Sequence, residues 1–589
     1  MPRSYPKQSD SWFNRQLEQL QLHLSRSDAL IQLAALGLIS GILAGGIIVL
    51  FRVIVEGIQA GMLQGDSENY EILSLEARFL FPVAGSLVLA LMFHFFSRGT
   101  HMLGVASVIE RIAYHQGYLT LRSFFLQFFG AAIAIISGHS VGREGPHIFL
   151  GAASSSLLGQ YFKLPNNSIR TLVGCGTAAG IAASFNTPLA GVIFALEVVM
   201  MEYTLASFMP VMLAAVSATA ISIAVFGNEA AFIVPDLQMG TLIELPLVIV
   251  LGLLAGTLSA LFIHLLQAVT HKTAKLGFSF KLVLSGIIVG LIATMIPGVM
   301  SIGYDSVSAM LAGTMVFNAL LLLLVFKLLA TVVSVGLGIP GGMIGPALFL
   351  GACLGGVFGM SIRWLFPDLQ VDVGFYSLLG MGAVMGASLQ APLAALTAMM
   401  ELTHSPQIIM PGMIAIVIAN LTASEIFRKK SLFISMLEAN DINVVANPIT
   451  QTLRRIGVAS VMNKAVAQVA QRVSMAQANA LLSDNPEWLL IKNGENECNR
   501  LLPAIDLVRF IEQHQQQMSE DALLDLLEIP AKRLEVTAIH LQATLEEALT
   551  ELDQQNLEAL YVQRMIAPGI QHVYGVLTRA QIELAYQFK

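Results

Sequence analysis

The sequence predicts a mostly α-helical, polytopic membrane domain built from two related halves, followed by a small α/β domain. The first observation is composition: of 589 residues, 55% are hydrophobic and only 12% are charged, and the mean hydropathy of +0.71 lies well above the range of soluble domains. The second is that apolar segments recur from about Ile31 to Ile426, many of them long enough to span a bilayer. The third is that this apolar, glycine-rich character ends near Asn440, and from Arg455 onward the chain reads as a soluble domain.

The first 27 residues are predicted to form a cytoplasmic N-terminal arm. They are polar and show no signal-peptide cleavage pattern. Arg3, Lys7, Arg15 and Arg26 precede the first apolar segment, and three basic residues at 428–430 follow the last one. Because basic residues concentrate on the cytoplasmic side, both termini are expected in the cytoplasm. The stretch 1–11 need not fold, and it could enter and plug a pathway that opens on that side.

The membrane domain, placed at residues 28–438, contains two repeats at about 34–225 and 245–430. Three sequence patterns occur once in each repeat and in the same order. Matching helix breakers in two halves indicate a site near the middle of the bilayer, built from broken helices. Small residues that only allow close helix packing would not explain the repeated order. The paired patterns are GILAG at 41–45 with GLLAG at 252–256, Gly-Pro at 145–146 with Gly-Pro at 345–346, and segment 174–197 with segment 380–401.

A charged pentapeptide, GREGP at residues 142–146, interrupts the apolar sequence of the first repeat. A carboxylate at membrane depth is costly, so Glu144 is predicted to belong to a transport or ion site. Glycines and a proline at the start of a helix let a ligand approach backbone N–H groups, which carry the positive end of the helix dipole. This segment therefore offers a place for a small anion together with a tethered carboxylate that can compete for it, which is the arrangement of a gate.

The soluble C-terminal region is predicted to hold two copies of one small α/β unit. Two capping-box patterns, at 474–477 and 544–547, each start a short helix, and they lie 70 residues apart (544 − 474). Each helix leads to an apolar strand and then to a strand-to-helix transition. The expected boundaries are a linker at 439–455, a first copy at 456–515, a second linker at 516–532 and a second copy at 533–589.

Together these motifs resemble the CLC family of chloride channels and chloride/proton exchangers, with two C-terminal CBS modules. The resemblance covers about residues 34–589 and rests on GREGP at 142–146, GMIGP at 342–346 and FNTPLAG at 185–191. It implies two inverted halves, a homodimer in which each subunit has its own chloride pathway, and Glu144 as the external gate. It also implies chloride as the bound ion and no required cofactor. We expect a multi-pass protein of a bacterial inner membrane.

The resemblance also assigns the anion-binding positions, two of which depart from the family pattern. Ungapped counting puts Leu103 where the family has an anion-binding serine and Phe433 where it has a tyrosine. Central anion binding should then be weak and depend on backbone N–H groups, unless a register shift lets Thr100, Ser107 or Ser435 supply a hydroxyl. Arg143 either concentrates anions at the mouth or snorkels to the surface. The predicted anion-binding residues are Leu103, Gly104, Val105, Arg143, Gly145, Met343, Ile344 and Phe433.

The family's inward-facing proton-relay glutamate corresponds to Val198, which cannot carry a proton. Neighbouring Glu197 should face elsewhere, because successive helical residues point about 100° apart. With its repeat mate Glu401, it is expected to satisfy backbone groups at helix ends. His139 and His147 flank the gate and, unless they are solvated loop residues, could move its titration into the neutral range.

The sequence therefore favours a passive chloride channel gated by Glu144. The alternative is a chloride/proton exchanger, or antiporter, with a non-standard internal proton path. A sodium-coupled organic solute transporter fits less well, because it needs a larger pocket and cation-binding carbonyls. An intramembrane enzyme would need paired acids or an activated nucleophile, and no enzymatic activity is expected. The net charge of −7 does not suggest a nucleic-acid partner, and the three cysteines lack metal-ligand spacing.

The CBS resemblance implies a regulatory module that can bind an adenine nucleotide between its two copies. The ribose-binding aspartate of that family corresponds to Asp506 in the first copy, whereas Gln581 stands at this place in the second copy. One nucleotide site at most is expected, with Asp506 and Thr578 as its residues. Support of the dimer without a ligand is the alternative.

Overall fold

The computed structural model describes residues 21–587 with short gaps, and the chain forms two compact units. The larger unit comprises residues 33–160 and 169–445, and the smaller one comprises the described parts of 1–32, 161–168 and 446–589. The predicted plug at 1–11 and the alternative donor Thr100 lie outside the described residues. The gaps are 23, 25–28, 64–67, 98, 100–102, 229–231, 233, 236, 238, 370, 404, 445–447, 494–496, 515–522 and 568–569.

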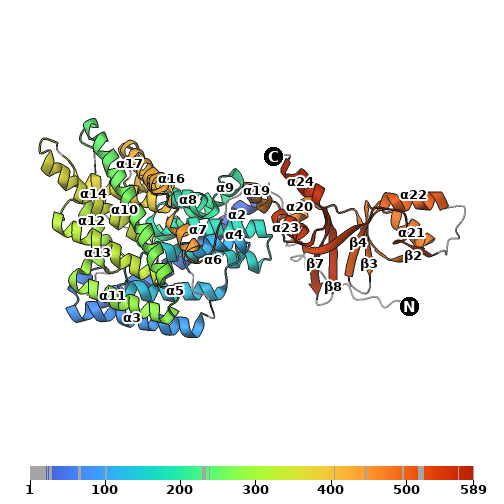
Figure 1. Ribbon diagram of the computed structural model, residues 1–589, viewed down its shortest axis with the longest axis horizontal. Helices are drawn as coiled ribbons and strands as arrows, with labels where there is room; N and C mark the ends of the chain where they lie inside the picture. The colour runs from blue at the N-terminus through green and yellow to red at the C-terminus, as the bar shows by residue number, and fades with distance from the viewer. Residues whose placement is uncertain are drawn as a thin grey trace. The chain divides into compact units, whose positions relative to one another are not determined.

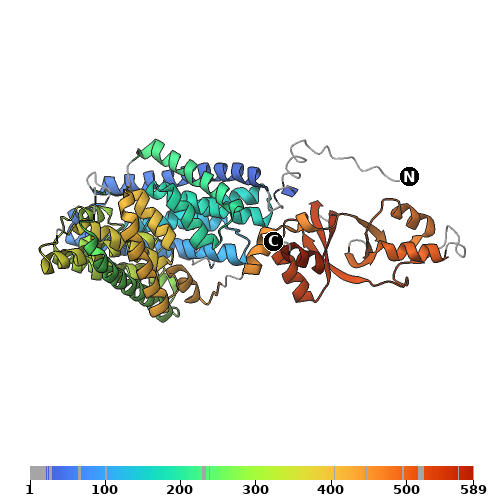
Figure 2. The ribbon, with the colours of Figure 1, turned by 90° about the horizontal axis from the view of Figure 1, so that it is seen from above.

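The larger unit is a bundle of helices, seen from two directions in Figure 1 and Figure 2. Helix α3 lies along α11, and α14 lies along α15. The helices of the first half are α2 (Leu30–Met62), α3 (Leu75–Phe96), α4 (Val105–Tyr114), α5 (Leu121–Ile136), α6 (Glu144–Tyr161), α7 (Asn166–Phe185), α8 (Pro188–Phe194) with its π-helical continuation η2 (Ala195–Met200), and α9 (Leu205–Phe226). Those of the second half are α10 (Leu245–Lys272), α11 (Phe278–Met295), α12 (Tyr304–Leu311), α13 (Phe317–Gly336), α14 (Ile344–Leu365), α15 (Val373–Leu389), α16 (Pro392–Thr403), α17 (Ile409–Leu421) with η6 (Thr422–Ile426), and α18 (Leu432–Glu438).

Local sequence signals set where these helices begin. The side chains of Ser74, Thr120 and Thr204 accept backbone N–H groups in the first turns of α3, α5 and α9, which satisfies donors that have no partner inside the helix. Pro188 and Pro392 occupy the first positions of α8 and α16, where a missing N–H costs nothing. The predicted breaks therefore fall at equivalent places in the two repeats.

Helices α6 and α14 begin inside the unit. Their first residues, Glu144 and Ile344, are 0% and 1% exposed. The loops before them meet, because the N–H of Gly142 donates to the carbonyl of Gly342 at 2.8 Å and the N–H of Gly342 donates to the carbonyl of Gly142 at 2.7 Å. This exchange is reciprocal, so equivalent residues of the two repeats face each other. The predicted architecture of two related halves with broken helices is confirmed.

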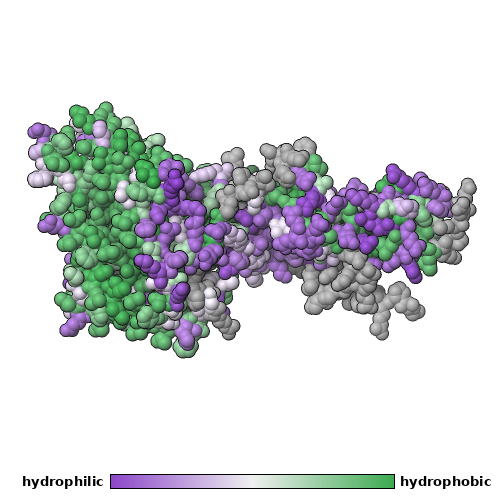
Figure 3. Space-filling view, in the orientation of Figure 1, coloured by the Kyte–Doolittle hydropathy of each residue, from purple (hydrophilic) through white to green (hydrophobic). Residues whose placement is uncertain are grey.

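The surface of the larger unit is apolar. Eight helices in the described part of the chain are long and apolar enough to cross a membrane. Large hydrophobic side chains are exposed along α2, α3 and α13, among other helices. Figure 3 shows a largely hydrophobic visible face on the larger unit and a largely hydrophilic one on the smaller unit. Lipid is the environment that suits such a surface, in agreement with the predicted multi-pass membrane domain.

The C-terminal part of the smaller unit contains two α/β repeats. They share one six-stranded sheet in the order β1-β3-β4-β6-β7-β8, in which β1 pairs with β3 and β6 pairs with β7 in parallel. The first repeat consists of β1 (Val466–Ala470), β2 (Arg472–Ser474), α21 (Met475–Leu482), β3 (Trp488–Asn493), β4 (Glu497–Pro503) and α22 (Ala504–His514). The second consists of β5 (Leu523–Asp525), β6 (Leu534–His540), α23 (Leu545–Gln555), β7 (Ala559–Ala567), β8 (Ile570–Thr578) and α24 (Arg579–Gln587).

Both predicted helix starts have an N-cap, and the one at Ser474 is a complete capping box. The side chain of Ser474 accepts the N–H of Gln477 at 3.2 Å, and that of Thr544 accepts the N–H of Glu547 at 3.4 Å. The strands and strand-to-helix transitions lie where the pattern placed them. One difference concerns the stretch 439–455, predicted as a linker, which contains helix α19 (Pro448–Arg455).

Candidate functional site

The carboxylate of Glu144 is bound between two elements of the second repeat. Its Oε2 accepts the backbone N–H of Gly345, the second residue of α14, at 3.1 Å. Its Oε1 accepts the phenol O–H of Tyr304, the first residue of α12. Backbone N–H groups in the first turn of a helix carry partial positive charge and favour anions. The carboxylate therefore occupies a site that a small anion could also occupy.

Glycines make this approach possible. A Cβ atom on Gly345 would lie 2.9 Å from Oε2 of Glu144, and one on Gly145 would lie 2.6 Å from the Cα of Gly342. The first contact would push the carboxylate away, and the second would separate the two loops. Both loops of the site thus depend on residues without side chains.

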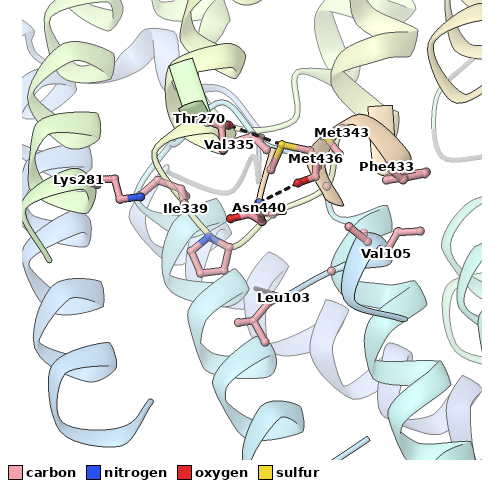
Figure 4. Close-up of a pocket in the computed structure, with 18 of the residues that line it drawn as sticks. Leu103, Val105, Thr270, Lys281, Val335, Ile339, Met343, Phe433, Met436 and Asn440 are labelled. Atoms are coloured by element: carbon pink, nitrogen blue, oxygen red, sulfur yellow. Dashed lines mark hydrogen bonds between the residues drawn. The ribbon is translucent and has the colours of Figure 1, made fainter. Parts of the chain in front are cut away.

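A cavity of about 390 Å³ lies next to these loops (Figure 4). Polar groups in its lining are few: the hydroxyl of Thr270, the amide of Asn440 and the ammonium group of Lys281, which is the only charged side chain among the described lining residues. The N-terminal ends of α4 and α6 and the loop before α14 contribute backbone to the lining. Six of the eight predicted anion-binding residues line it, namely Leu103, Gly104, Val105, Gly145, Met343 and Phe433.

The other two predicted anion-binding residues lie elsewhere. Ile344 starts α14 and lines a separate small cavity rather than the large one. Arg143 is only 7% exposed, and its Nη1 donates to Glu56 at 2.7 Å, while its guanidinium carbon lies 5.1 Å from the ring centroid of Tyr304. The alternative in which Arg143 snorkels to the surface is wrong, because an acidic partner holds the side chain inside the unit.

Leu103 and Phe433 both line the large cavity, as the ungapped alignment places them. The hydroxyl of Ser435, one of the alternative donors, donates to the backbone carbonyl of Lys430 at 3.1 Å instead. Ser107, a second alternative, is buried on α4 and is not among the lining residues. These positions favour the alignment without a register shift.

Glu197 and Glu401 each bind the start of a helix in the other repeat. Glu197, in the continuation of α8, binds the start of α16, and Glu401, in α16, binds the start of α8. Glu197 accepts the N–H groups of Leu393 and Ala394, at 3.3 and 2.8 Å, in the first turn of α16. Glu401 accepts the equivalent groups at the start of α8, at 2.9 and 2.8 Å. This reciprocal arrangement agrees with the structural role expected for both carboxylates. Val198, at the relay position, is buried.

The two histidines that flank Glu144 in the sequence are not solvated. His139 lies within 3.0 Å of the Ser86 hydroxyl, and His147 lies within 2.9 Å of the Ser184 hydroxyl; both histidines are 0% exposed. The expectation of solvated loop residues is wrong, because the apolar helices around them enclose both rings.

Sequence reasoning missed Tyr304 and Lys327 of the second repeat, the first of which binds the Glu144 carboxylate. Tyr304 stands 160 residues from Glu144, outside every repeated motif. Lys327 is fully buried on α13 and donates to three backbone carbonyls in the segment just before Tyr304, at 3.1, 2.9 and 3.3 Å. Its only sequence signal was a lone lysine in an otherwise apolar span, which indicates a buried partner but does not say which.

In the smaller unit, Asp506 is the third residue of α22, and Thr578 lies immediately before α24. Asp506 lies 3.8 Å from Arg509, one turn later in α22. Thr578 forms a cap with Gln581: its N–H donates to Gln581 Oε1 at 2.8 Å, and its hydroxyl accepts the N–H of Gln581 at 3.3 Å. Gln581, which stands where the aspartate is expected, thus caps the first turn of α24 together with Thr578.

Comparison with known proteins identifies the family of the chain. A family model described as voltage gated chloride channel matches residues 84–424, which is more than half of the chain. The chain is 33% identical over 370 residues to a putative chloride channel protein ClcB-like from Ralstonia nicotianae, covering 62% of this chain and 86% of that protein. It is 30% identical over 313 residues to an H(+)/Cl(-) exchange transporter ClcA from Vibrio cholerae, covering 51% of this chain and 67% of that protein.

Two solved structures share the fold. One is the X-ray crystal structure of a slow cyanobacterial Cl−/H+ antiporter, with a TM-score of 0.62 and 23% identity over 69% of this chain and 97% of that one. The other is a eukaryotic CLC transporter, with a TM-score of 0.60 and 17% identity over 94% of this chain and 98% of that one. The second match extends over the membrane unit and most of the C-terminal region.

Proposed function

Because the chain belongs to the voltage gated chloride channel (CLC) family, we propose that it exchanges chloride for protons across a membrane, with Glu144 as its gate. The observation that carries this proposal is the carboxylate of Glu144 bound to the N–H of Gly345 at the start of α14. A group in that position blocks an anion when it is ionised. It leaves, or is displaced, when it is protonated or when chloride competes for the same donors.

Chloride reaches the gate through the cavity of about 390 Å³. Lys281 attracts the anion, and the backbone at the ends of α4, α6 and α14 replaces part of its hydration. Leu103 and Phe433 offer no hydroxyl there, so the ion is held weakly in the cavity. Both termini lie on the cytoplasmic side in this proposal, which the basic flanks of the membrane domain support.

The proton takes a path that avoids the relay position, where Val198 cannot carry it. A second cavity, of about 20 Å³, has room for one water molecule and is lined by Ile344, the residue before Gly345, and by Ala394 at the start of α16. The buried hydroxyl of Thr187 lines it too and has no hydrogen-bond partner in the described part of the chain. Water at Thr187 would pass the proton toward Glu144.

Exchange is preferred to the passive channel that the sequence alone favoured. A 30% identical relative is named an H(+)/Cl(-) exchange transporter, which supports exchange. Because Val198 cannot carry a proton, exchange in this chain requires a different proton path. The ClcB-like relative is named a putative chloride channel protein and keeps the channel as the second candidate.

Reconstituted liposomes test the proposal. A chloride gradient should drive protons uphill, and the reversal potential should move with the proton gradient. Glu144→Gln, which imitates the neutral gate, should keep chloride flux while it removes proton movement and most of the pH dependence. A reversal potential that stays at the chloride equilibrium potential under every proton gradient would establish the passive channel instead.

We also propose a homodimer that uses the exposed apolar side chains of α8, α9, α16 and α17. Leu189, Leu213, Leu393 and Val417 are exposed on these neighbouring helices. Leu393→Trp should weaken the dimer in mild detergent, whereas Leu87→Trp, at a similarly exposed position on α3, should not. Crosslinking that finds only monomers of the unmodified protein would contradict the proposal.

For the C-terminal region we propose one adenine nucleotide site that uses Asp506, with Thr578 beside it. Thermal unfolding of the full chain should shift upward with ATP or AMP, and Asp506→Ala should remove the shift. No shift with either nucleotide would leave this region with a structural role only.

A further inference from the structure

Tyr304 contacts the gate with a group that distinguishes its two protonation states. Its phenol O–H donates to Oε1 of Glu144, while the N–H of Gly345 binds Oε2, so both carboxylate oxygens are held from the second repeat. A hydrogen bond to an ionised carboxylate is roughly twice as strong as one between neutral groups. The contact is therefore strongest when Glu144 is ionised and in place.

The tyrosine is fixed by its own surroundings and is 4% exposed. Its backbone N–H donates to Glu68 at 2.7 Å, and the rings of Phe185 and Phe232 lie at centroid distances of 6.2 and 5.6 Å. Lys327 ties down the preceding segment through its three carbonyl contacts. Because these contacts orient the phenol before the carboxylate arrives, little order is lost when the hydrogen bond forms.

We propose that Tyr304 is a positioning residue that latches the gate, and that its O–H sets the external pH at which Glu144 releases the pathway. The inference rests on the proposed role of Glu144 and deepens it. Protonation of the carboxylate replaces a charge-assisted hydrogen bond by a neutral one, so the closed position loses its advantage. The latch thus converts a change of protonation into a change of position.

Other charged groups lie around this pair. The test must distinguish their effect on chloride flux from that of the Tyr304 phenol. Arg143 stacks against the tyrosine ring and is paired with Glu56, and Glu68 binds the backbone of α12. The titratable or charged residues that face the pair from the neighbouring elements are Arg52 and Glu56 of α2, Glu68, Arg143, His147 of α6, Asp305 of α12 and Lys327 of α13. The test must therefore alter the phenol alone.

The chain offers a matched control in Tyr376. Its O–H donates to Glu244 at 3.0 Å, and both residues are buried, with exposed fractions of 0% and 3%. Glu244 also accepts the N–H of Thr241 at the start of η3 (Leu242–Glu244), where it completes a capping box. The pair has the same chemistry as Tyr304 with Glu144, but neither of its residues belongs to a loop of the gate.

The experiment measures chloride flux into liposomes as a function of external pH for Tyr304→Phe, with Tyr376→Phe as control. Tyr304→Phe should move the pH of half-maximal flux upward by about one unit, a tenfold change in the proton concentration required. Tyr376→Phe should leave that midpoint in place. A fluorinated tyrosine at position 304, which is a stronger donor of the same shape, should move the midpoint downward and covers the case in which Tyr304→Phe fails to fold.

The double variant Tyr304→Phe/Glu144→Gln separates this inference from the proposed function. It should match Glu144→Gln alone, because the latch has no ionised gate to hold. If Glu144→Gln removes pH dependence but Tyr304→Phe leaves the midpoint unchanged, the latch is refuted and the gate stands. If Glu144→Gln itself keeps the full pH dependence, the proposed gate fails first. Equal shifts in Tyr304→Phe and Tyr376→Phe would also overturn the latch.

Discussion

Glu197 and Glu401 allow a test in which one repeat serves as the control for the other. Each carboxylate accepts two backbone N–H groups at the start of a helix in the opposite repeat, at 2.8 and 2.9 Å for Glu401 and at 2.8 and 3.3 Å for Glu197. Only Glu197 is next to Val198, the residue that the family resemblance aligns with the proton relay. Replacing each in turn by glutamine separates a structural role, which both share, from a proton-carrying role, which only Glu197 could have.

The expected loss of stability follows from these contacts. A hydrogen bond to a charged group contributes about 1.5–3 kcal/mol. Glutamine keeps one acceptor oxygen and turns an NH₂ group toward the second N–H, so one such bond is lost, together with about 0.3–1 kcal/mol of interaction with the helix dipole. We expect Glu401→Gln to cost about 3 kcal/mol and Glu197→Gln about 2 kcal/mol, because one of the two bonds of Glu197 is longer and weaker, at 3.3 Å.

Thermal unfolding in detergent and chloride-driven proton uptake in liposomes provide the two readouts. Both variants should unfold at lower temperature than the unmodified protein, in the order given above. Both should keep the ratio of protons to chloride, because neither carboxylate carries the proton in the proposed path. If Glu197→Gln abolishes proton uptake while Glu401→Gln preserves it, the structural assignment of Glu197 is refuted and the path through Thr187 loses its basis.

Three further predictions concern single side chains. Thr187→Val should keep chloride flux but slow proton uptake. The control is Thr177→Val, which removes another buried hydroxyl without a partner among the described residues and should leave proton uptake unchanged. Equal proton uptake in both variants would contradict the water path. Lys281→Gln should lower chloride flux by about twofold to fivefold at low ionic strength and less at high ionic strength, while exposed Lys275→Gln serves as the control. Hydrogen bonds, chiefly from the N–H of Leu527, hold the pKa of Asp525 below its usual range. The ionised carboxylate therefore stabilises the fold at neutral pH, and this stabilisation is lost as the pH falls through the folded pKa. Asp525→Asn should lower the unfolding temperature of the smaller unit at neutral pH but not in strong acid.

Features set by neighbouring residues could be predicted from the sequence. Short motifs predicted the helix N-caps at Ser474 and Thr544 and the helix starts at Pro188 and Pro392. The order of the repeated motifs indicated that the two Gly-Pro loops meet. The positions of Leu103 and Phe433 on one cavity followed from the family alignment.

Pairings between distant residues could not be predicted in this way. Tyr304 and Glu144 are 160 residues apart, and Arg143 and Glu56 are 87 apart; in both cases the choice of partner depends on how whole helices pack. The hydropathy of α13 predicted an apolar span, yet Lys327 is fully buried within it because carbonyls from the segment before α12 surround its ammonium group. A single sequence contains no signal for such tertiary partners.

The reciprocal backbone bonds between Gly142 and Gly342 have a mechanical consequence. They join the two halves beside Glu144, where the proposed function has the anion pass, and neither glycine has a side chain that could shift if the halves separated. Halves that rocked apart there would break both bonds, so the cycle must run past a stationary backbone. A covalent cross-link between the two loops would then leave turnover intact. The same cross-link would stop any transporter that opens by moving its two halves apart.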